Sequence, residues 1–312
     1  MDPSFYSSEF VARDAEVIRQ QLNISELSVY GVSYGTIPAT IYASLFPKAT
    51  RALVLEGVVN TAQESIISGD HRRRLLQRMI DKLPSDVVAL MSSVTATYGL
   101  SDEWFSVISR NLLTSDDGLA NLDSKMRKLT DPTAFSELLT EIKSAFTPIT
   151  FVPHPVFTAN EVAYFMISCQ ELGLAEANAT TADSFASGKL SPKLDSVSKA
   201  ACDLLGVRTS KLYDPTKYPV TVPVTYFQGS TDSATSAAGA IHHYKTVPKS
   251  AKQLLIRVNG GHPPNNSAIR SKDLAQAQIF TRALLGQQVP MSLVEEARKS
   301  QKVWWSYTSK NF

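Results

Sequence analysis

Apolar residues follow two patterns along this 312-residue chain: short continuous runs near both ends, and helical spacing between them. The first run begins at Leu27, and the other three cover 51–56, 221–227 and 253–258. A short, unbroken apolar run is typical of a strand in a parallel sheet that is covered on both faces. Strands that alternate with helical segments predict a right-handed, mostly parallel α/β sheet of about four strands.

Helical spacing follows each run and also precedes the first one. The segment 8–22 predicts an amphipathic helix, with Ser7 or Ser8 as its N-cap. Its apolar stripe consists of Phe10, Val11, Ile18 and Leu22. Further helices are expected at 37–45, 236–246, 270–285 and 291–305.

The middle of the chain has a different pattern of apolar residues, in which runs typical of strands are nearly absent and segments with helical spacing follow one another. Breakers such as Thr147-Pro148 separate these helices. We expect three parts: residues 1–60 as the first part of an α/β core, 61–215 as a helical cap, and 216–312 as the rest of the core. The cap helices are expected at 71–82, 85–98, 102–113, 133–146 and 160–174.

Composition narrows the class of protein. The hydrophobic fraction of 43% and charged fraction of 19% are those of a soluble globular protein, and a net charge of +2 favours neither nucleic acid nor an anionic membrane as partner. No apolar run approaches the length of a membrane span, and the first residues lack the regions of a signal peptide. Secretion stays open if the natural start lies upstream. We expect no metal and no organic cofactor, since the sequence holds no ligand cluster and no phosphate-binding glycine loop.

The strand that begins at Leu27 ends in Gly31-Val32-Ser33-Tyr34-Gly35, and a helix follows. Gly-x-Ser-x-Gly between a strand and a helix is typical of a nucleophile elbow, a turn so sharp that the serine hydroxyl points outward. Glycines are expected at 31 and 35 because side chains there would crowd the bend. Ser33 is therefore a candidate nucleophile, and the Tyr34 backbone N–H a candidate oxyanion donor. The alternative is an ordinary strand–helix turn.

A serine nucleophile needs a base, and the base needs an orienting carboxylate. Asp232 follows the run 221–227, and His262 follows the run 253–258 behind two glycines. Both lie where catalytic groups gather in open α/β sheets, just past the C-terminal ends of strands. We expect Asp232 as the acid and His262 as the base. The alternatives are a turn-forming aspartate and a structural loop histidine.

Three segments resemble the tripeptidyl-aminopeptidase and prolyl-aminopeptidase group of serine peptidases: 30–36, 53–59, and the set of Gly229, Asp232 and Gly261-His262. The resemblance implies an α/β-hydrolase fold with a helical cap. It also implies Ser33, Asp232 and His262 as the triad, and release of short N-terminal peptides or residues from peptide substrates. An esterase with the same triad is the nearest alternative.

The chain has two cysteines, Cys169 and Cys202. Their spacing leaves two buried thiols and one disulfide equally open. The resemblance implies a 169–202 disulfide. It also matches a cap motif at Cys169-Gln170-Glu171, by which the Glu171 carboxylate would pair with the α-ammonium of a peptide substrate. The alternative is an exposed helical glutamate.

The sequence departs from that family before the elbow. A complete α/β-hydrolase has several strands there, whereas one predicted helix precedes Leu27 here. We therefore expect a partial sheet that lacks the N-terminal strands, an elbow strand at the sheet edge, and no loop for the second oxyanion donor. An apolar edge invites a complementing N-terminal half or self-association. A truncated, catalytically silent half-domain that binds such a partner is the non-enzymatic alternative.

Overall fold

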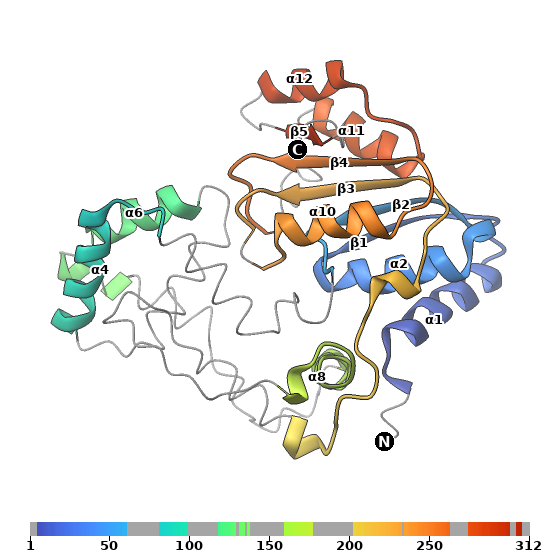
Figure 1. Cartoon of the computed structure of the whole chain (residues 1–312), viewed down its shortest axis with the longest axis horizontal. Helices are drawn as coiled ribbons and strands as arrows, with labels where there is room; N and C mark the ends of the chain where they lie inside the picture. Colours follow the sequence, from blue (N-terminus) through green and yellow to red (C-terminus); the bar gives the residue numbers. More distant parts are fainter. Residues whose placement is uncertain are drawn as a thin grey trace.

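The computed structural model describes residues 5–60, 81–98, 118–128, 131–134, 136–137, 159–176, 202–232, 234–262, 274–299 and 304–307. These residues form a five-stranded sheet in the order β1-β2-β3-β4-β5 (Figure 1). Four strands pair in parallel and match the predicted runs: β1 (Leu27–Val32), β2 (Thr50–Glu56), β3 (Val224–Gly229) and β4 (Lys252–Arg257). The predicted parallel α/β sheet is confirmed.

The last strand differs from the sequence prediction. Residues 291–305 were expected to be one helix, but α12 (Met291–Lys299) ends early and β5 (Trp304–Tyr307) pairs antiparallel with β4. That prediction is wrong because it extended the helical spacing into an aromatic run, Trp304-Trp305-Ser306-Tyr307, whose residues favour a strand.

Successive residues of the central strands point to opposite faces of the sheet, and helices cover both faces. On one face, Leu53 and Leu55 of β2 pack with Tyr226 of β3 under α2 (Thr36–Leu45) and α10 (Ala237–Thr246). On the other face, Val54 and Phe227 pack against α11 (Leu274–Leu284) and α12. Both faces are therefore apolar, which explains the continuous apolar runs in the sequence.

The long segment between β2 and β3 leaves the sheet and returns beside the strand it left, since Glu56 of β2 pairs with Phe227 of β3. Its described helices are α4 (Ser85–Tyr98), α6 (Gly118–Lys128) and α8 (Ala159–Glu171). The helices predicted at 85–98 and 160–174 are confirmed, with α8 ending three residues early. The helix predicted at 102–113, and most of those predicted at 71–82 and 133–146, lie outside the described residues, and residues 81–82 form a turn.

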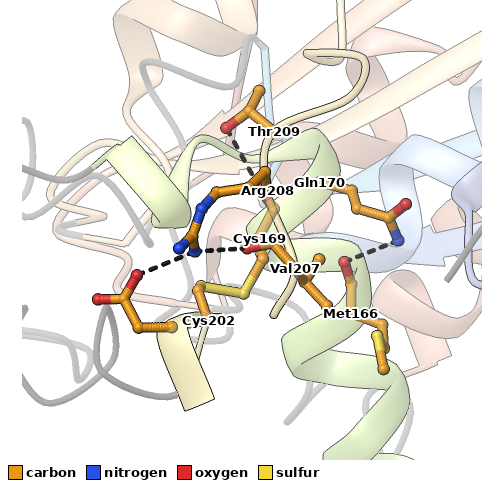
Figure 2. The surroundings of a disulfide bond; sticks show 8 residues. Met166, Cys169, Gln170, Cys202, Val207, Arg208 and Thr209 are labelled. Carbon is orange, nitrogen blue, oxygen red and sulfur yellow. Dashed lines mark hydrogen bonds and ion pairs between the residues drawn. A yellow bond between two sulfur atoms is a disulfide. The ribbon is translucent and has the colours of Figure 1, made fainter. Parts of the chain in front are cut away.

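A disulfide joins Cys169 of α8 to Cys202, which confirms the pairing that the family resemblance implied (Figure 2). The segment after Cys202 passes the C-terminal end of α8, where the Ser210 N–H donates to the Gln170 carbonyl and the Tyr213 N–H to the Glu171 carbonyl. The C-terminal end of α8 is thus fixed covalently and by backbone hydrogen bonds. No helix in the described ranges combines the length and apolar character needed to cross a membrane.

The helix α1 (Ser8–Gln21) has its apolar stripe on the outside. Ser7 caps it as expected, by accepting from the Phe10 N–H. Its buried residues are Ser8, Ala12 and Glu16, where an amphipathic helix ordinarily buries its stripe. All four predicted stripe residues are exposed: Phe10, Val11, Ile18 and Leu22. The exposed fraction is 59% for Ile18 and 63% for Leu22.

The contacts of α1 explain this orientation. The small side chain of Ala12 packs against Ile41 and Tyr42 of α2, and the Tyr42 hydroxyl donates to Glu16 at 2.8 Å. The strand β1 is the first strand of the sheet, and no described strand pairs with its outer edge (Figure 1). The elbow strand therefore lies at an edge of the described sheet, as predicted.

Candidate active site

The turn after β1 holds Ser33 in the left-handed region, at φ +53°. Such a backbone is strained for a residue with a side chain and persists only where the surroundings impose it. A Cβ on Gly31 would lie 2.4 Å from the Gly35 carbonyl oxygen and 2.8 Å from the Ala39 Cβ, so only glycine fits there. At Gly35 a Cβ would point into open space, so the crowding expected at position 35 is wrong.

Three residues that are far apart in sequence meet at the C-terminal ends of the parallel strands. The Ser33 Oγ lies 2.9 Å from the His262 Nε2, and the His262 Nδ1 lies 2.8 Å from the Asp232 Oδ2. Because an ionised carboxylate only accepts, Nδ1 carries the proton toward Asp232, and Nε2 is left to accept from the serine hydroxyl. The structure thus brings together the three residues that the sequence nominated, with the spacing of a nucleophile, a base and an orienting acid.

Asp232 is 4% exposed and uses both carboxylate oxygens. Its Oδ1 accepts from the backbone N–H groups of Ala234 and Thr235 at 2.8 and 2.7 Å. Its Oδ2 faces His262 and also accepts from the Thr235 hydroxyl at 2.8 Å. One oxygen of Asp232 thus makes the contacts of a turn-forming aspartate, and the other faces His262.

Sequence reasoning missed two polar residues of this site. The Gln228 side chain donates to the Asp232 Oδ2 at 3.1 Å and to the Thr235 carbonyl at 2.8 Å, and its Oε1 accepts from the Val58 N–H. The Thr235 Oγ1 also lies 3.2 Å from the His262 Nδ1. The available sequence signal for Gln228 was a polar residue directly after the apolar run 221–227. These donors satisfy a buried carboxylate that would otherwise be costly.

Gly57 leaves the space that the His262 ring occupies. It has φ +60°, and a Cβ there would lie 2.8 Å from the His262 Cε1. Any side chain at position 57 would meet both a strained backbone and the imidazole. The residue after β2 therefore shapes the site without contributing a functional group.

Glu171 is buried, 9% exposed, so the interpretation as an exposed helical glutamate is wrong. Both of its carboxylate oxygens lie 3.1 Å from the Ser8 backbone nitrogen, at the N-terminus of α1. Burial raises the pKa of Glu171, and the hydrogen bonds from Ser8 oppose that rise. A cavity of about 490 Å³ adjoins it, lined among others by Glu9, Phe10 and Lys211; Ser33, Asp232 and His262 do not line this cavity.

Other histidines of the described part of the chain have structural roles. The His243 Nδ1 lies 2.8 Å from the Tyr226 hydroxyl in the core, and burial lowers the pKa of His243 to about 3. The neighbouring His242 contacts the Asn60 side chain at 3.2 Å. Across the described ranges, no group of three or more His, Cys, Asp or Glu side chains is placed to hold a metal ion.

Comparison with known proteins agrees with this architecture. A family model described as the alpha/beta hydrolase fold matches residues 1–265. This match covers most of the chain, so the protein belongs to the alpha/beta hydrolase fold family.

Individual relatives match a short part of the chain. A tripeptidyl aminopeptidase of Streptomyces lividans is 44% identical over 55 residues, which are 18% of this chain and 10% of that protein. The serine protease Hip1 of Mycobacterium bovis is 39% identical over 56 residues, 18% of this chain and 11% of that protein. The chain therefore aligns with about a tenth of the length of these curated relatives.

Among solved structures, MGS-M2, an alpha/beta hydrolase enzyme from a Medee basin deep-sea metagenome library, superposes with a TM-score of 0.45 at 12% identity. The match covers 91% of this chain and 74% of that chain.

Proposed function

We propose that this protein is a serine hydrolase in which Ser33 is the nucleophile, His262 the general base and Asp232 the residue that orients His262. The observation that carries the proposal is the continuous hydrogen-bonded chain from the Ser33 Oγ through the His262 ring to the Asp232 carboxylate. The strained backbone of Ser33 supports it, because strain of this kind gathers at functional sites.

The proposed reaction has two halves. The Ser33 Oγ attacks the scissile carbonyl carbon while its proton moves to the His262 Nε2, and the Tyr34 N–H stabilises the resulting oxyanion. The imidazolium, stabilised by Asp232, then protonates the leaving group, and an acyl-enzyme remains. In the second half, His262 takes a proton from water, the hydroxide attacks the acyl carbon, and Ser33 is released with its proton restored.

For the substrate, we propose short peptides cleaved near a free N-terminus. The support is the family resemblance of the motifs together with the local similarity to a tripeptidyl aminopeptidase. Recognition of the substrate α-ammonium by Glu171 stays a prediction from that resemblance. Esters are the alternative substrates, since the same three residues perform either acyl transfer.

A second candidate function rests on a different observation. The outer edge of β1 carries no described strand, and the helix α1, which precedes β1 in the chain, exposes its apolar stripe. An unpaired strand edge favours pairing with another strand, and exposed apolar side chains favour association. In this alternative the chain is catalytically silent and binds a complementing N-terminal segment, or a second copy, through that edge.

A fluorophosphonate probe separates the two candidates. We expect wild-type protein to gain one phosphonyl mass and Ser33→Ala protein to gain none, since the probe reacts with activated serines. A folded wild-type monomer that gains no mass would favour the silent, partner-binding alternative. A panel of free and N-acetylated tripeptide amides, with matched esters, then identifies the substrate class.

A further inference from the structure

Three side chains from three separate elements form one chain of hydrogen bonds beside the nucleophile turn. Glu171 ends α8, Ser8 begins α1, and Tyr34 directly follows Ser33. The Ser8 Oγ donates to the Glu171 Oε2 at 2.5 Å, and it lies 3.0 Å from the Tyr34 hydroxyl oxygen. The Ser8 backbone N–H points at the same carboxylate. A helix end distant in sequence is thus connected to the residue that follows the nucleophile.

The direction of these hydrogen bonds follows from the available protons. A serine hydroxyl holds one proton, and an ionised carboxylate can only accept. Because the Ser8 proton points to Glu171, the Ser8 Oγ must accept from the Tyr34 O–H. Glu171 therefore orients Ser8, and Ser8 in turn holds the end of the Tyr34 side chain.

Two of the three members of this chain are buried and Tyr34 is partly buried, which makes the chain costly to break. Ser8 is fully buried and Glu171 nearly so, and burial raises the pKa of Tyr34 to about 12. The carboxylate lies at the positive end of the α1 dipole, which stabilises its charge. Removing Ser8 or Glu171 would leave a buried polar group without its partner, a larger loss than that of an exposed hydrogen bond.

We propose that Glu171 is a positioning residue of the nucleophile turn, acting through Ser8 and the Tyr34 side chain on the backbone N–H of Tyr34. This inference rests on the serine hydrolase function proposed above. Fixing the Tyr34 ring at its hydroxyl end restricts rotation of the peptide that supplies the oxyanion donor. Such a donor lowers the barrier only when it is held in place before the reaction begins.

The positioning role and the ammonium-binding role of Glu171 differ in what they affect. A glutamate that binds the substrate ammonium changes only the reaction of peptides with a free amine. A glutamate that positions Tyr34 changes every reaction at Ser33, including that with a fluorophosphonate or an N-acetylated peptide. In the structure both Glu171 oxygens already accept from Ser8, which favours the positioning role.

Two adjacent serines provide a matched pair of variants. Ser8→Ala removes the hydroxyl that joins Glu171 to Tyr34, whereas Ser7→Ala removes the N-cap that accepts from the Phe10 N–H on the same helix end. We expect Ser8→Ala and Tyr34→Phe to slow phosphonylation of Ser33 and to lower kcat roughly tenfold, part of the 10²–10³ that a lost oxyanion donor costs. KM should change little, for free and N-acetylated peptides alike. Ser8→Thr should restore most of the rate, and Ser7→Ala should keep it.

Several outcomes would overturn the inference. Equal phosphonylation rates for Ser8→Ala and wild type would do so, as would a Glu171→Gln variant impaired only with free-amine peptides. If wild-type protein is not labelled at all, the proposed hydrolase function fails. The positioning of Tyr34 by Glu171 and Ser8 is then tested by a measurement that does not need activity. Hydrogen exchange at the Tyr34 amide should then be faster in Ser8→Ala than in Ser7→Ala, and equal exchange in the two variants would contradict it.

Discussion

The loops after β3 and β4 and the helix α1 use polar and apolar residues in opposite ways. Around Asp232, a buried carboxylate accepts from two backbone N–H groups, a threonine, a glutamine and a histidine. In α1 the buried positions are small or polar, whereas the apolar stripe faces outward. The first region has the features of a site whose buried charge is fully hydrogen-bonded. The second has the features of a surface that can bind another polypeptide segment.

The two candidate functions therefore draw on different residues, those around Asp232 and those on the exposed face of α1. Burying a charge with every lone pair satisfied requires many residues to agree, which is typical of a site under functional constraint. An exposed apolar stripe is unfavourable in water, and a strand edge without a described partner can pair with another strand, so both features are typical of an interaction surface. Substitutions on the exposed face of α1 can therefore test the surface while the hydrogen bonds around Asp232 stay in place.

The largest effect is expected from Asp232→Asn. Asparagine keeps the shape of the side chain, but it offers an NH₂ donor or a neutral oxygen to the His262 Nδ1, so the ring loses its fixed tautomer and charge stabilisation. We expect kcat to fall by about 10⁴ while the protein stays folded. Steady-state kinetics with circular dichroism as the folding control measures this. A loss of less than about tenfold would remove Asp232 from the proposed triad.

Thr235→Val tests whether the Thr235 hydroxyl supports Asp232 and His262. Valine has nearly the shape of threonine but removes the hydroxyl that lies 2.8 Å from the Asp232 Oδ2 and 3.2 Å from the His262 Nδ1. We expect a loss of about 1–2 kcal/mol in the free energy of unfolding and a slower phosphonylation of Ser33. Thr235→Ser should retain both values near wild type. If Thr235→Val reacts like wild type, the hydroxyl is not needed by the site.

Ala12→Leu and Ile18→Ser test which face of α1 is buried. Ala12 is buried against Ile41 and Tyr42, so a larger side chain should cost about 1–3 kcal/mol in the free energy of unfolding. Ile18 is exposed, so the polar serine should change that free energy by no more than about 0.5 kcal/mol in a monomer. Urea denaturation gives both values. The reverse order would mean that the predicted stripe, and not Ala12, faces the core.

Stability at low pH gives the smallest expected effect. The hydrogen bond from Arg19, with those from Gln20 and Tyr42, lowers the pKa of Glu16 to about 2 against burial. The unfolded state binds the proton more readily, so the contribution of Glu16 is complete above pH 4.5 and is lost as the pH falls toward 2. The urea midpoint of wild type should therefore fall more steeply over this window than that of Glu16→Gln. Parallel curves would contradict the role of Glu16.

Most of the sheet was predictable from the sequence because its signals are local. The four parallel strands follow from apolar runs, and the elbow follows from Gly31 and Ser33 between a strand and a helix. Asp232 and His262 could be nominated because catalytic side chains follow strand ends in parallel sheets. Their meeting with Ser33 needed only the order of the strands, which right-handed connections largely fix.

What the sequence did not predict depends on contacts between distant segments. Nothing local marks Ser8 as a partner of Glu171, since 163 residues separate them. The orientation of α1 was also hidden, because its apolar spacing is that of a helix facing the core, and only its fit against α2 turns Ala12 and Glu16 inward. The strand β5 was missed because the helical spacing before it was extended too far.

The location of the covalent adduct decides whether Ser33 is the nucleophile. After reaction with a fluorophosphonate, peptide mapping by mass spectrometry should place the phosphonyl group on Ser33 in wild-type protein, and a His262→Gln variant should carry almost none. Such a result would show an activated serine that depends on its histidine partner. An adduct on another serine, or equal labelling of the His262→Gln variant, would contradict the account.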